Sequence, residues 1–546
     1  MQCTRSRSAD DLSQGSTESS DSYAALTSPS SDYSDCEFCE ERKRKYNSLR
    51  SPQCKTSYLN PVSCITRYYN TMDRRETEPL VTSPSAVPVY MSVTSESDSL
   101  GPGEFSSSEI LATHKRIENQ RKPDRRKQSS LVTIFSVWNT IMGSSLLTMA
   151  WGVERAGLPV ALVLVAIMSA LCLYTAYVLL RVHKRHGTGS ATCEVPALCR
   201  ILLGQTAEGI AHVFSLIVLF GANIVYWILI TNFLYFTVNY FVDLTSNTTD
   251  YNTTLLCPKH DGVNGSLIIP VPNYDTPYWG LHSTVPVYVA VIVFPLLNFK
   301  NVSFFTKFNS LGTLSVAYLL IFVLVKSIAW GVNIETQPTD AHPGQDAAVL
   351  SGMLALSFYI HNIIITIMSN NDRQENNGRD LTIAFILVTL TYILVGGVFY
   401  ICFPLAKSCI EDNILNNFEM HDIMTAVARI LLLFQVVTVY PLVAYMLRCE
   451  AILLLPFQDN RCLTISINTG IVAVCIVAAC FCPNIGTIIR YTGAVSGLVH
   501  IFALPSLLQV RSLQLRGELS LTKAILYCSI VLCGAINLVM QFFIKE

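Results

Sequence analysis

Two clusters of polar residues interrupt stretches that are otherwise apolar, and these clusters are the best candidates for holding a small ligand. The first cluster consists of Asn139, Thr140, Gly143, Ser144 and Ser145. A helix that unwinds at such a point frees carbonyl oxygens for a cation and starts a half-helix whose N-terminus attracts a carboxylate. The alternative is that the small residues only let neighbouring helices pack closely.

The second cluster lies in the sequence LSGMLALSFYIHNIIITIM and contains Ser357, Tyr359, His361, Asn362 and Thr366. It falls five apolar stretches after the first cluster. An inverted repeat of five helices plus five would place the two interruptions around one site. Matching interruptions in both halves therefore favour a binding site over close packing alone.

The composition describes the elements that must position these clusters. The chain has 546 residues, of which 51% are hydrophobic and 14% are charged, and its mean hydropathy is +0.40. Soluble domains carry about 25% charged residues, so a large soluble enzyme is disfavoured and membrane lipid is the expected surrounding. The net charge of −1 excludes attraction of the whole chain to nucleic acid.

Eleven stretches are long and apolar enough to cross a membrane, because a spanning helix needs about 20 mostly apolar residues. We therefore predict an all-α integral membrane protein with eleven transmembrane helices. The stretches lie near residues 131–153, 157–182, 207–242, 284–300, 304–330, 348–368, 381–404, 422–448, 463–482, 485–510 and 521–543.

The distribution of Lys and Arg predicts a cytosolic N-terminus and a lumenal C-terminus. Three glycosylation sequons, at Asn247, Asn252 and Asn264, fall in one loop that this topology places outside the cytosol. Cys257 and Cys409 fall in outer loops, where an oxidising lumen would let them form a disulfide. The alternative is two free thiols whose Cα atoms lie too far apart.

The eighth apolar stretch contains a further set of polar residues, which includes a candidate ligand for a cation and a charged residue. The hydroxyl oxygen of Thr438 is a hard ligand that suits a small cation, and Gln435 lies one turn before it. Arg429 lies about two turns inside the predicted outer end of this helix. A charge at that depth is a candidate functional residue, and the alternative is an anchor at the membrane interface.

Four strings carry a resemblance to a known family: WNTIMGSSLLTMAWGVERAG (138–157), HNIIITIMSNNDRQENNGRDL (361–381), ARILLLFQVVTVYPL (428–442) and CPNIGTIIRYTGA (482–494). They resemble the sodium-coupled neutral amino acid transporters of the amino-acid/auxin permease superfamily. Within that family they resemble a lysosomal, arginine-gated branch that transports and senses amino acids. The resemblance covers about residues 130–544 and implies a LeuT-like fold, a five-plus-five inverted repeat with one extra helix, and alternating access.

The resemblance also implies roles for single residues. Asn139 and Thr438 match positions that bind sodium, which is the one cofactor expected; no organic cofactor is expected. The resemblance also matches the unwound segment that holds the amino acid to Thr140, Met142, Gly143, Ser144 and Ser145. The second polar cluster adds Tyr359, His361 and Asn362 to the residues expected to bind substrate. No acidic residue in this set would hold a guanidinium group, so arginine as ligand is implied by the family and not by these residues.

The first 128 residues are rich in Ser and poor in apolar residues, so we expect a disordered cytosolic tail. The transport core is expected over 129–510, and the eleventh helix with a lumenal C-terminus over 511–546. The apolar segments 64–72 and 78–93 are typical of tails that fold on a partner. The resemblance implies docking onto the Rag GTPase–Ragulator complex, with Tyr69 and Met72 as anchors; the alternative is a linker without function.

The leading hypothesis is a secondary active amino acid transporter of the lysosomal or late endosomal membrane. It would be arginine-responsive and sodium-coupled, would carry neutral amino acids such as leucine or glutamine, and would signal amino acid sufficiency to the Rag GTPase and mTORC1 machinery. The alternative is a receptor for amino acids whose transport is vestigial. An intramembrane enzyme has little support, because the chain has no G-x-S-x-G, no H-E-x-x-H and no paired intramembrane acids.

Overall fold

The computed structural model describes residues 127–187, 194–246, 255–257, 275–298, 312–334, 346–455 and 461–544. Within these ranges the chain is helical, and its only β-type pairs are three isolated bridges. The predicted glycosylation sites Asn247, Asn252 and Asn264 and the predicted tail anchors Tyr69 and Met72 lie outside the described residues.

Eight helical stretches of the described chain are long and apolar enough to cross a membrane. They are α6 (Leu158–His186), α8 (Gln205–Ser246), α11 (Gly312–Trp330), the stretch Gln374–Cys402, α16 (Ile423–Leu454), α17 (Arg461–Phe481), the stretch Ile485–Leu515 and α20 (Leu521–Gln541). A ninth span consists of α4 (Ser130–Ile141) and α5 (Ser145–Ala156), which bend by 63° at their junction.

Two shorter apolar helices lie where the fourth and sixth spans are predicted. They are α9 (Val285–Leu297) and α12 (Ala347–Ser357). The helical membrane class is thus confirmed for the described chain. The total of eleven spans and the sides on which the termini lie stay predictions.

Both predicted interruptions are present. Residues 142–144 separate α4 from α5, and residues 358–363 separate α12 from α13 (Ile364–Ser369). At the first break, Gly143 and Ser144 have low helix propensity, and the serine hydroxyl can form hydrogen bonds with the backbone that compete with those of a helix. The polar clusters therefore mark helix ends inside the bundle and not merely close packing. The relation of the two halves as an inverted repeat stays a prediction.

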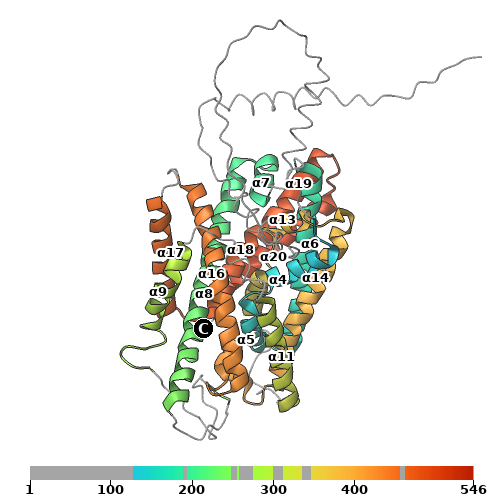
Figure 1. Cartoon of the computed structure of the whole chain (residues 1–546). Helices are drawn as coiled ribbons and strands as arrows, with labels where there is room; N and C mark the ends of the chain where they lie inside the picture. Colours follow the sequence, from blue (N-terminus) through green and yellow to red (C-terminus); the bar gives the residue numbers. More distant parts are fainter. Residues whose placement is uncertain are drawn as a thin grey trace, which may run out of the picture. The chain divides into compact units, whose positions relative to one another are not determined.

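The long helix α8 packs against α16 and α18 (Ile485–Gly497), and α12 packs against α18 and α5. Figure 1 shows α8 and α16 running side by side through the described region. The contact between α12 and α18 is very close, because a Cβ atom at Gly493 would lie 2.2 Å from the carbonyl oxygen of Gly352. Only glycine fits at Gly493 without a backbone shift, so this residue fixes how the first half of the second broken span is seated.

Two of the long spans contain short π-helical segments. The first, Ile393–Val398, joins α14 (Asn377–Tyr392) to α15 (Phe399–Cys402), and the second, Leu498–Ala503, joins α18 to α19 (Leu504–Leu515). Such segments interrupt the regular i to i−4 ladder and are frequent at functional sites. The first of them packs against α5, directly after the first break.

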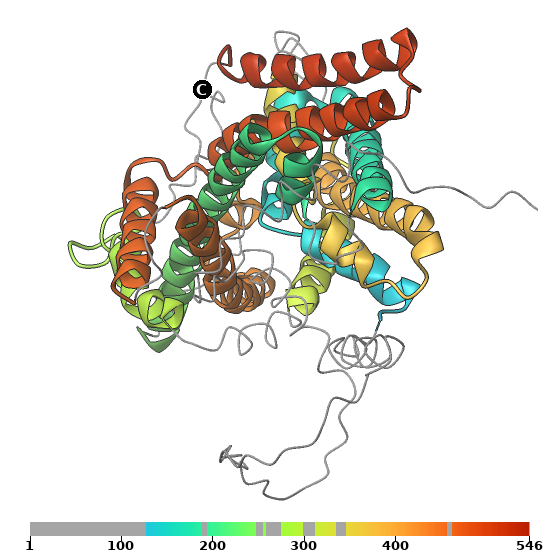
Figure 2. The same cartoon turned by 90° about the horizontal axis from the view of Figure 1, so that it is seen from above.

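The last span, α20, is drawn in red along one edge of the bundle in Figure 2.

The loop between α15 and α16 contains two 3-10 turns, Lys407–Cys409 and Ile414–Asn417. Cys409 forms a disulfide with Cys257, and the two Cα atoms are 4.8 Å apart, so the predicted pairing is confirmed. The backbone amide of Leu256 also donates to the carbonyl oxygen of Asn417 over 2.8 Å. Two loops that are distant in the sequence are therefore joined both covalently and by hydrogen bonds.

Candidate functional site

A cavity of about 230 Å³ lies at the two helix breaks. It is lined by residues of both breaks together with residues of α8, α11 and α16. Its volume is below the roughly 300–1,000 Å³ of pockets that hold drug-sized ligands. The cavity is therefore of a size for a small metabolite.

The first break supplies Asn139, Thr140, Met142, Gly143 and Ser144 to the wall of the cavity. In the described chain the backbone amides of Gly143 and Ser144 donate to no acceptor. They directly precede α5, so they lie at the positive end of a helix of 12 residues. This geometry suits the carboxylate of a ligand, because unpaired amides and the helix dipole both favour a negative charge.

The second break supplies Tyr359, Asn362 and Ile363 to the same cavity. The hydroxyl group of Tyr359 is buried and has no hydrogen-bond partner among the described residues. Its ring packs edge-on against His500, with 5.7 Å between the ring centroids. A buried hydroxyl without a partner is costly, so a polar ligand group in the cavity would relieve that cost.

Tyr392, near the end of α14, touches both breaks through one hydroxyl group. The hydroxyl donates to the carbonyl oxygen of Ser357 over 2.8 Å. It also lies 3.4 Å from the carbonyl oxygen of Ile141 and 3.4 Å from the Oγ of Ser145. Ser357 ends α12 and Ile141 ends α4, so Tyr392 holds the two broken spans together behind the cavity. Tyr392 escapes detection in the sequence, because one Tyr in an apolar stretch is ordinary.

Two further residues of the cavity are not assigned to the site from sequence. Tyr226 of α8 lines it, and a Cβ atom at Gly143 would lie 3.6 Å from the Tyr226 hydroxyl oxygen. Gln435 of α16 also lines it, and its buried Oε1 has no partner among the described residues. The polar side chain of Gln435 in an apolar stretch is a signal that sequence reasoning can use. Tyr226 lies in another apolar stretch, and nothing in that stretch distinguishes it from the other aromatic residues.

Two of the residues predicted to bind substrate lie behind the wall of the cavity. Ser145 does not line it and instead approaches Tyr392. His361 is fully buried, and its Nε2 lies 2.9 Å from the Oγ1 of Thr175 on α6. These two residues support the breaks from behind, and the ligand contacts predicted for them stay predictions.

The two predicted sodium ligands both offer oxygen atoms. Asn139 lines the cavity, and its Oδ1 accepts a hydrogen bond from the Oγ1 of Thr313 over 3.1 Å. Thr438 is buried outside the lining, and its Oγ1 donates to the carbonyl oxygen of Gln435 over 2.8 Å. A hydroxyl that donates its proton keeps both lone pairs, so Thr438 can still offer an oxygen to a cation. Their role in binding sodium stays a prediction.

Among the described residues, the wall of the cavity contains no Asp, Glu, Lys, Arg or His. Its polar groups are neutral, and they come from Asn139, Thr140, Ser144, Tyr226, Tyr359, Asn362 and Gln435. A zwitterion with a neutral side chain fits such a wall, since backbone amides and carbonyls can take its two charges. A guanidinium side chain would find only amide, hydroxyl and carbonyl oxygens here and no carboxylate.

Thr366 of α13 does not line the cavity and donates its hydroxyl proton to the carboxylate of Glu194. Glu194 directly precedes the short helix α7 (Val195–Leu202) and is only 3% exposed. Its second carboxylate oxygen has no partner among the described residues. Burial raises the pKa of Glu194 to about 8, so this side chain is mostly protonated at neutral pH.

Comparison with known proteins identifies close relatives. A family model described as "Transmembrane amino acid transporter protein" matches residues 126–544. The chain is 39% identical to the "Sodium-coupled neutral amino acid transporter 9 homolog" of Caenorhabditis elegans over 77% of this chain and 74% of that protein. It is 36% identical to the "Neutral amino acid transporter 9" of Xenopus tropicalis over 90% of this chain and 91% of that protein.

The chain is also similar to more distant proteins. The chain is 22% identical to the human "Solute carrier family 38 member 8" over 69% of this chain and 84% of that protein. Among solved structures, it is similar to that titled "Crystal structure of MhsT in complex with L-phenylalanine", with a TM-score of 0.47 and 12% identity over 77% of this chain and 99% of that one.

Proposed function

Because this chain belongs to the transmembrane amino acid transporter family, in its solute carrier 38 branch, we propose that it carries a neutral amino acid through the cavity at its two helix breaks. Members of this family are transporters, so the chain is a transporter and not an enzyme. Opening the cavity to each side of the membrane in turn would move the substrate.

One observation carries this proposal most directly: unpaired amides and unpaired polar side chains face one cavity from two broken spans. The amides of Gly143 and Ser144 would bind the substrate carboxylate, since they lie at the N-terminus of α5. The hydroxyl of Tyr359 and the amide oxygen of Gln435 would bind its polar groups from the other walls. The absence of charge in the wall favours a neutral side chain.

The coupling ion and the membrane belong to the same proposal. We infer that sodium drives transport through Asn139 and Thr438, supported by their oxygen atoms and by the words "sodium-coupled" in the name of the nematode relative. The resemblance of the four sequence strings supports a lysosomal or late endosomal membrane and a response to arginine. Arginine then acts as activator or as a ligand held by carbonyl groups, because the wall offers it no carboxylate.

A flux measurement tests this proposal. Purified full-length protein in liposomes is expected to take up radiolabelled leucine or glutamine in a saturable way. Uptake should increase with a sodium gradient and change when arginine is added. The absence of saturable uptake of every amino acid tested, with and without sodium and arginine, would contradict it.

A second candidate function, a receptor that reports amino acids through its N-terminal tail, is favoured by one contact. The backbone amide of Gln128 donates to the carbonyl oxygen of Asn370 over 2.8 Å. The backbone amide of Asp372 in turn donates to the carbonyl oxygen of Gln128 over 2.8 Å. Gln128, the last residue of the predicted tail, is therefore fastened to the loop that follows α13. A change at the second break could reach the tail through this loop.

The length of one match also supports a role for the tail. The frog relative matches 90% of this chain, so at most a tenth of the chain lies outside the match. Residues 1–126 make up more than a tenth of the 546 residues, so the match includes part of the tail. Under the receptor hypothesis, binding of the tail to the Rag GTPase–Ragulator complex depends on arginine even when transport is blocked. Deletion of residues 60–95 should abolish that binding. Binding that persists after this deletion would contradict the receptor hypothesis.

A further inference from the structure

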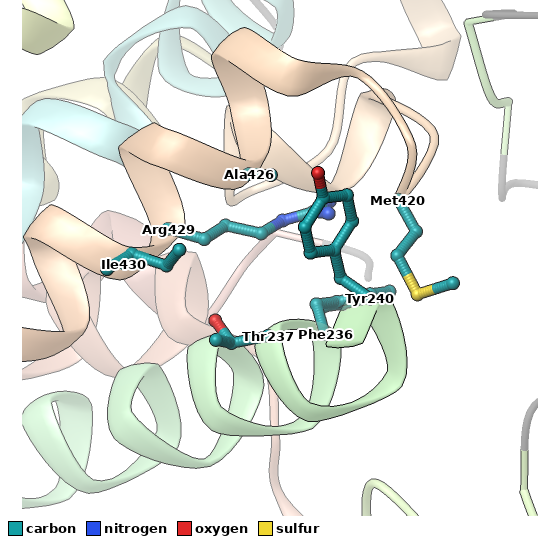
Figure 3. A pocket seen from close by; sticks show the side chains of 7 residues that line it. All are labelled: Phe236, Thr237, Tyr240, Met420, Ala426, Arg429 and Ile430. Carbon is teal, nitrogen blue, oxygen red and sulfur yellow. The ribbon is translucent and has the colours of Figure 1, made fainter. Parts of the chain in front are cut away.

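Arg429 lies in the second turn of α16, a membrane-spanning helix, and its charged side chain is buried in the protein. Its side chain is 1% exposed. It faces a small pocket between α8 and α16 whose other wall residues are Phe236, Thr237, Tyr240, Met420, Ala426 and Ile430. Figure 3 shows its side chain extending along this pocket toward Tyr240.

Only part of the guanidinium group has partners. Its Nη2 donates to the carbonyl oxygens of Leu415 and Phe418 over 2.8 and 3.1 Å. Its central carbon lies 4.3 Å from the ring centroid of Phe236, so it also makes a cation–π contact. Within the described chain, Nε and Nη1 are buried without any acceptor.

The nearby carboxylates are engaged by other groups. Asp422, seven residues before Arg429, accepts a hydrogen bond from the Nζ of Lys326 over 2.6 Å and another from the amide of Thr425 over 2.9 Å. Asp243 lies 2.7 Å from His421. Arg429 itself forms no ion pair with any carboxylate of the described residues.

This arrangement leaves a permanent positive charge with no anion in direct contact. A guanidinium group does not lose its proton in proteins, so burial cannot neutralise it. The carbonyl groups and the aromatic ring offset only part of the cost of burying an unpaired charge. A negative ion beside Nε and Nη1 would offset the remainder.

We propose that a small monovalent anion, such as chloride, binds beside Arg429 between α8 and α16. The hydroxyl of Thr237 lines the same pocket and is buried without a partner, so it supplies a second donor. The two sets of unpaired donors, on facing helices, form a site that no residue of the substrate cavity shares.

The pocket limits the size of the anion. The pocket is too narrow to admit a sphere the size of a water molecule, so an anion enters only when a wall side chain moves aside. Met420 is the flexible candidate, because its side chain is unbranched. A bulky anion such as gluconate is therefore excluded. The site goes beyond the proposed transport function, and its test needs no transport measurement.

The test compares unfolding temperatures of purified full-length protein in chloride and in gluconate at equal ionic strength. Binding to the folded state alone stabilises it, so chloride should raise the midpoint by about 1–2 °C in the wild type. Arg429→Gln should lose this difference. Arg448→Gln is the matched control on the same helix, where Nη1 of Arg448 lies 3.3 Å from the Oδ1 of Asn468, and it should keep the difference.

An acetate arm identifies the source of the negative charge. Stabilisation by acetate equal to that by chloride means that the site takes carboxylates as well as inorganic anions. Stabilisation by chloride alone means an inorganic ion. Either result supports an anion site at Arg429, provided that Arg429→Gln removes it.

A second variant keeps the test informative if Arg429→Gln does not fold. Thr237→Val removes one donor and leaves the charge, so the chloride concentration for the half-maximal shift should rise several-fold. A purely structural role of Arg429 predicts no difference between anions. The absence of a chloride effect in the wild type, or an equal effect in Arg429→Gln, would overturn the proposal, as would an unchanged concentration dependence in Thr237→Val.

Discussion

The hydroxyl group of Tyr392 donates to the carbonyl oxygen of Ser357 over 2.8 Å. Ser357 is the last residue of α12, and the same hydroxyl lies 3.4 Å from the carbonyl oxygen of Ile141, the last residue of α4. One hydroxyl group therefore lies against the last carbonyl group of each half-helix, and its single proton is donated to Ser357. The two halves of the candidate site are coupled through this residue.

Replacing Tyr392 by Phe should loosen that coupling and keep the ring. The ring packs edge-on against Phe358, with 5.4 Å between centroids, so the fold should survive. Loss of one buried hydrogen bond costs about 0.5–1.5 kcal/mol. We expect saturable uptake to fall several-fold, while the unfolding temperature falls by only a few degrees. Wild-type uptake in Tyr392→Phe liposomes would show that the tie between the breaks is dispensable.

Thr140→Trp should block the cavity. Thr140 lines it at the end of α4, and an indole there would occupy the space of the substrate. Uptake and amino acid binding should both be lost in the reconstituted variant. Leu314→Trp is the control, since Leu314 is 59% exposed on the outer side of α11. Normal uptake by Thr140→Trp would mean that the substrate binds elsewhere.

Thr438→Ala should reduce the dependence of uptake on sodium. The change removes one oxygen and leaves the backbone of α16 intact, because Ala is the best helix former. The sodium concentration for half-maximal uptake should rise several-fold, whereas maximal uptake at saturating sodium should change less. Thr469→Ala on the exposed side of α17 is the control. An identical sodium dependence in Thr438→Ala and wild type would remove Thr438 from the ion site.

Glu194→Gln should flatten the dependence of stability on pH. Burial raises the pKa of Glu194 from 4.5 to about 8. Between these values the folded protein holds a proton that the unfolded chain has lost, so the contribution of Glu194 to stability falls as pH rises. Gln keeps the neutral form throughout this window.

The measurement is the unfolding midpoint at steps from pH 5 to pH 8. Wild type should lose stability across this range more steeply than Glu194→Gln, with a difference on the order of a few kcal/mol at the upper end. Glu518→Gln serves as control, because its side chain is 44% exposed. Parallel curves for Glu194→Gln and wild type would contradict the raised pKa.

The breaks could be predicted from sequence because polar residues inside apolar stretches are costly unless the helix ends there. This reasoning predicts Asn139, Thr140, Gly143, Ser144, Tyr359 and Asn362, and all six line one cavity. The predicted topology places Cys257 and Cys409 on one side and so allows a disulfide, but the alternative of two free thiols is excluded only by the structure, where the bond forms. These inferences depend on local composition and on the count of spans.

The remaining features depend on tertiary contacts that local patterns do not encode. Tyr226 lines the cavity because of how α8 crosses the first break, and Tyr392 lies behind it because of how α14 packs. The π-helical segment Ile393–Val398 arises where the chain passes α5, and its sequence is apolar like any other span. The positions of Ser145 and His361 behind the wall likewise follow from side-chain packing and not from spacing.

The central claim is that a substrate amino acid binds where α4 meets α5 and α12 meets α13. A density map of the purified protein saturated with leucine tests it most directly. We expect ligand density in the cavity, with the carboxylate against the amides of Gly143 and Ser144 and the rest of the molecule toward Tyr359. Ligand density at any other place, or both spans continuous through the breaks, would contradict the account.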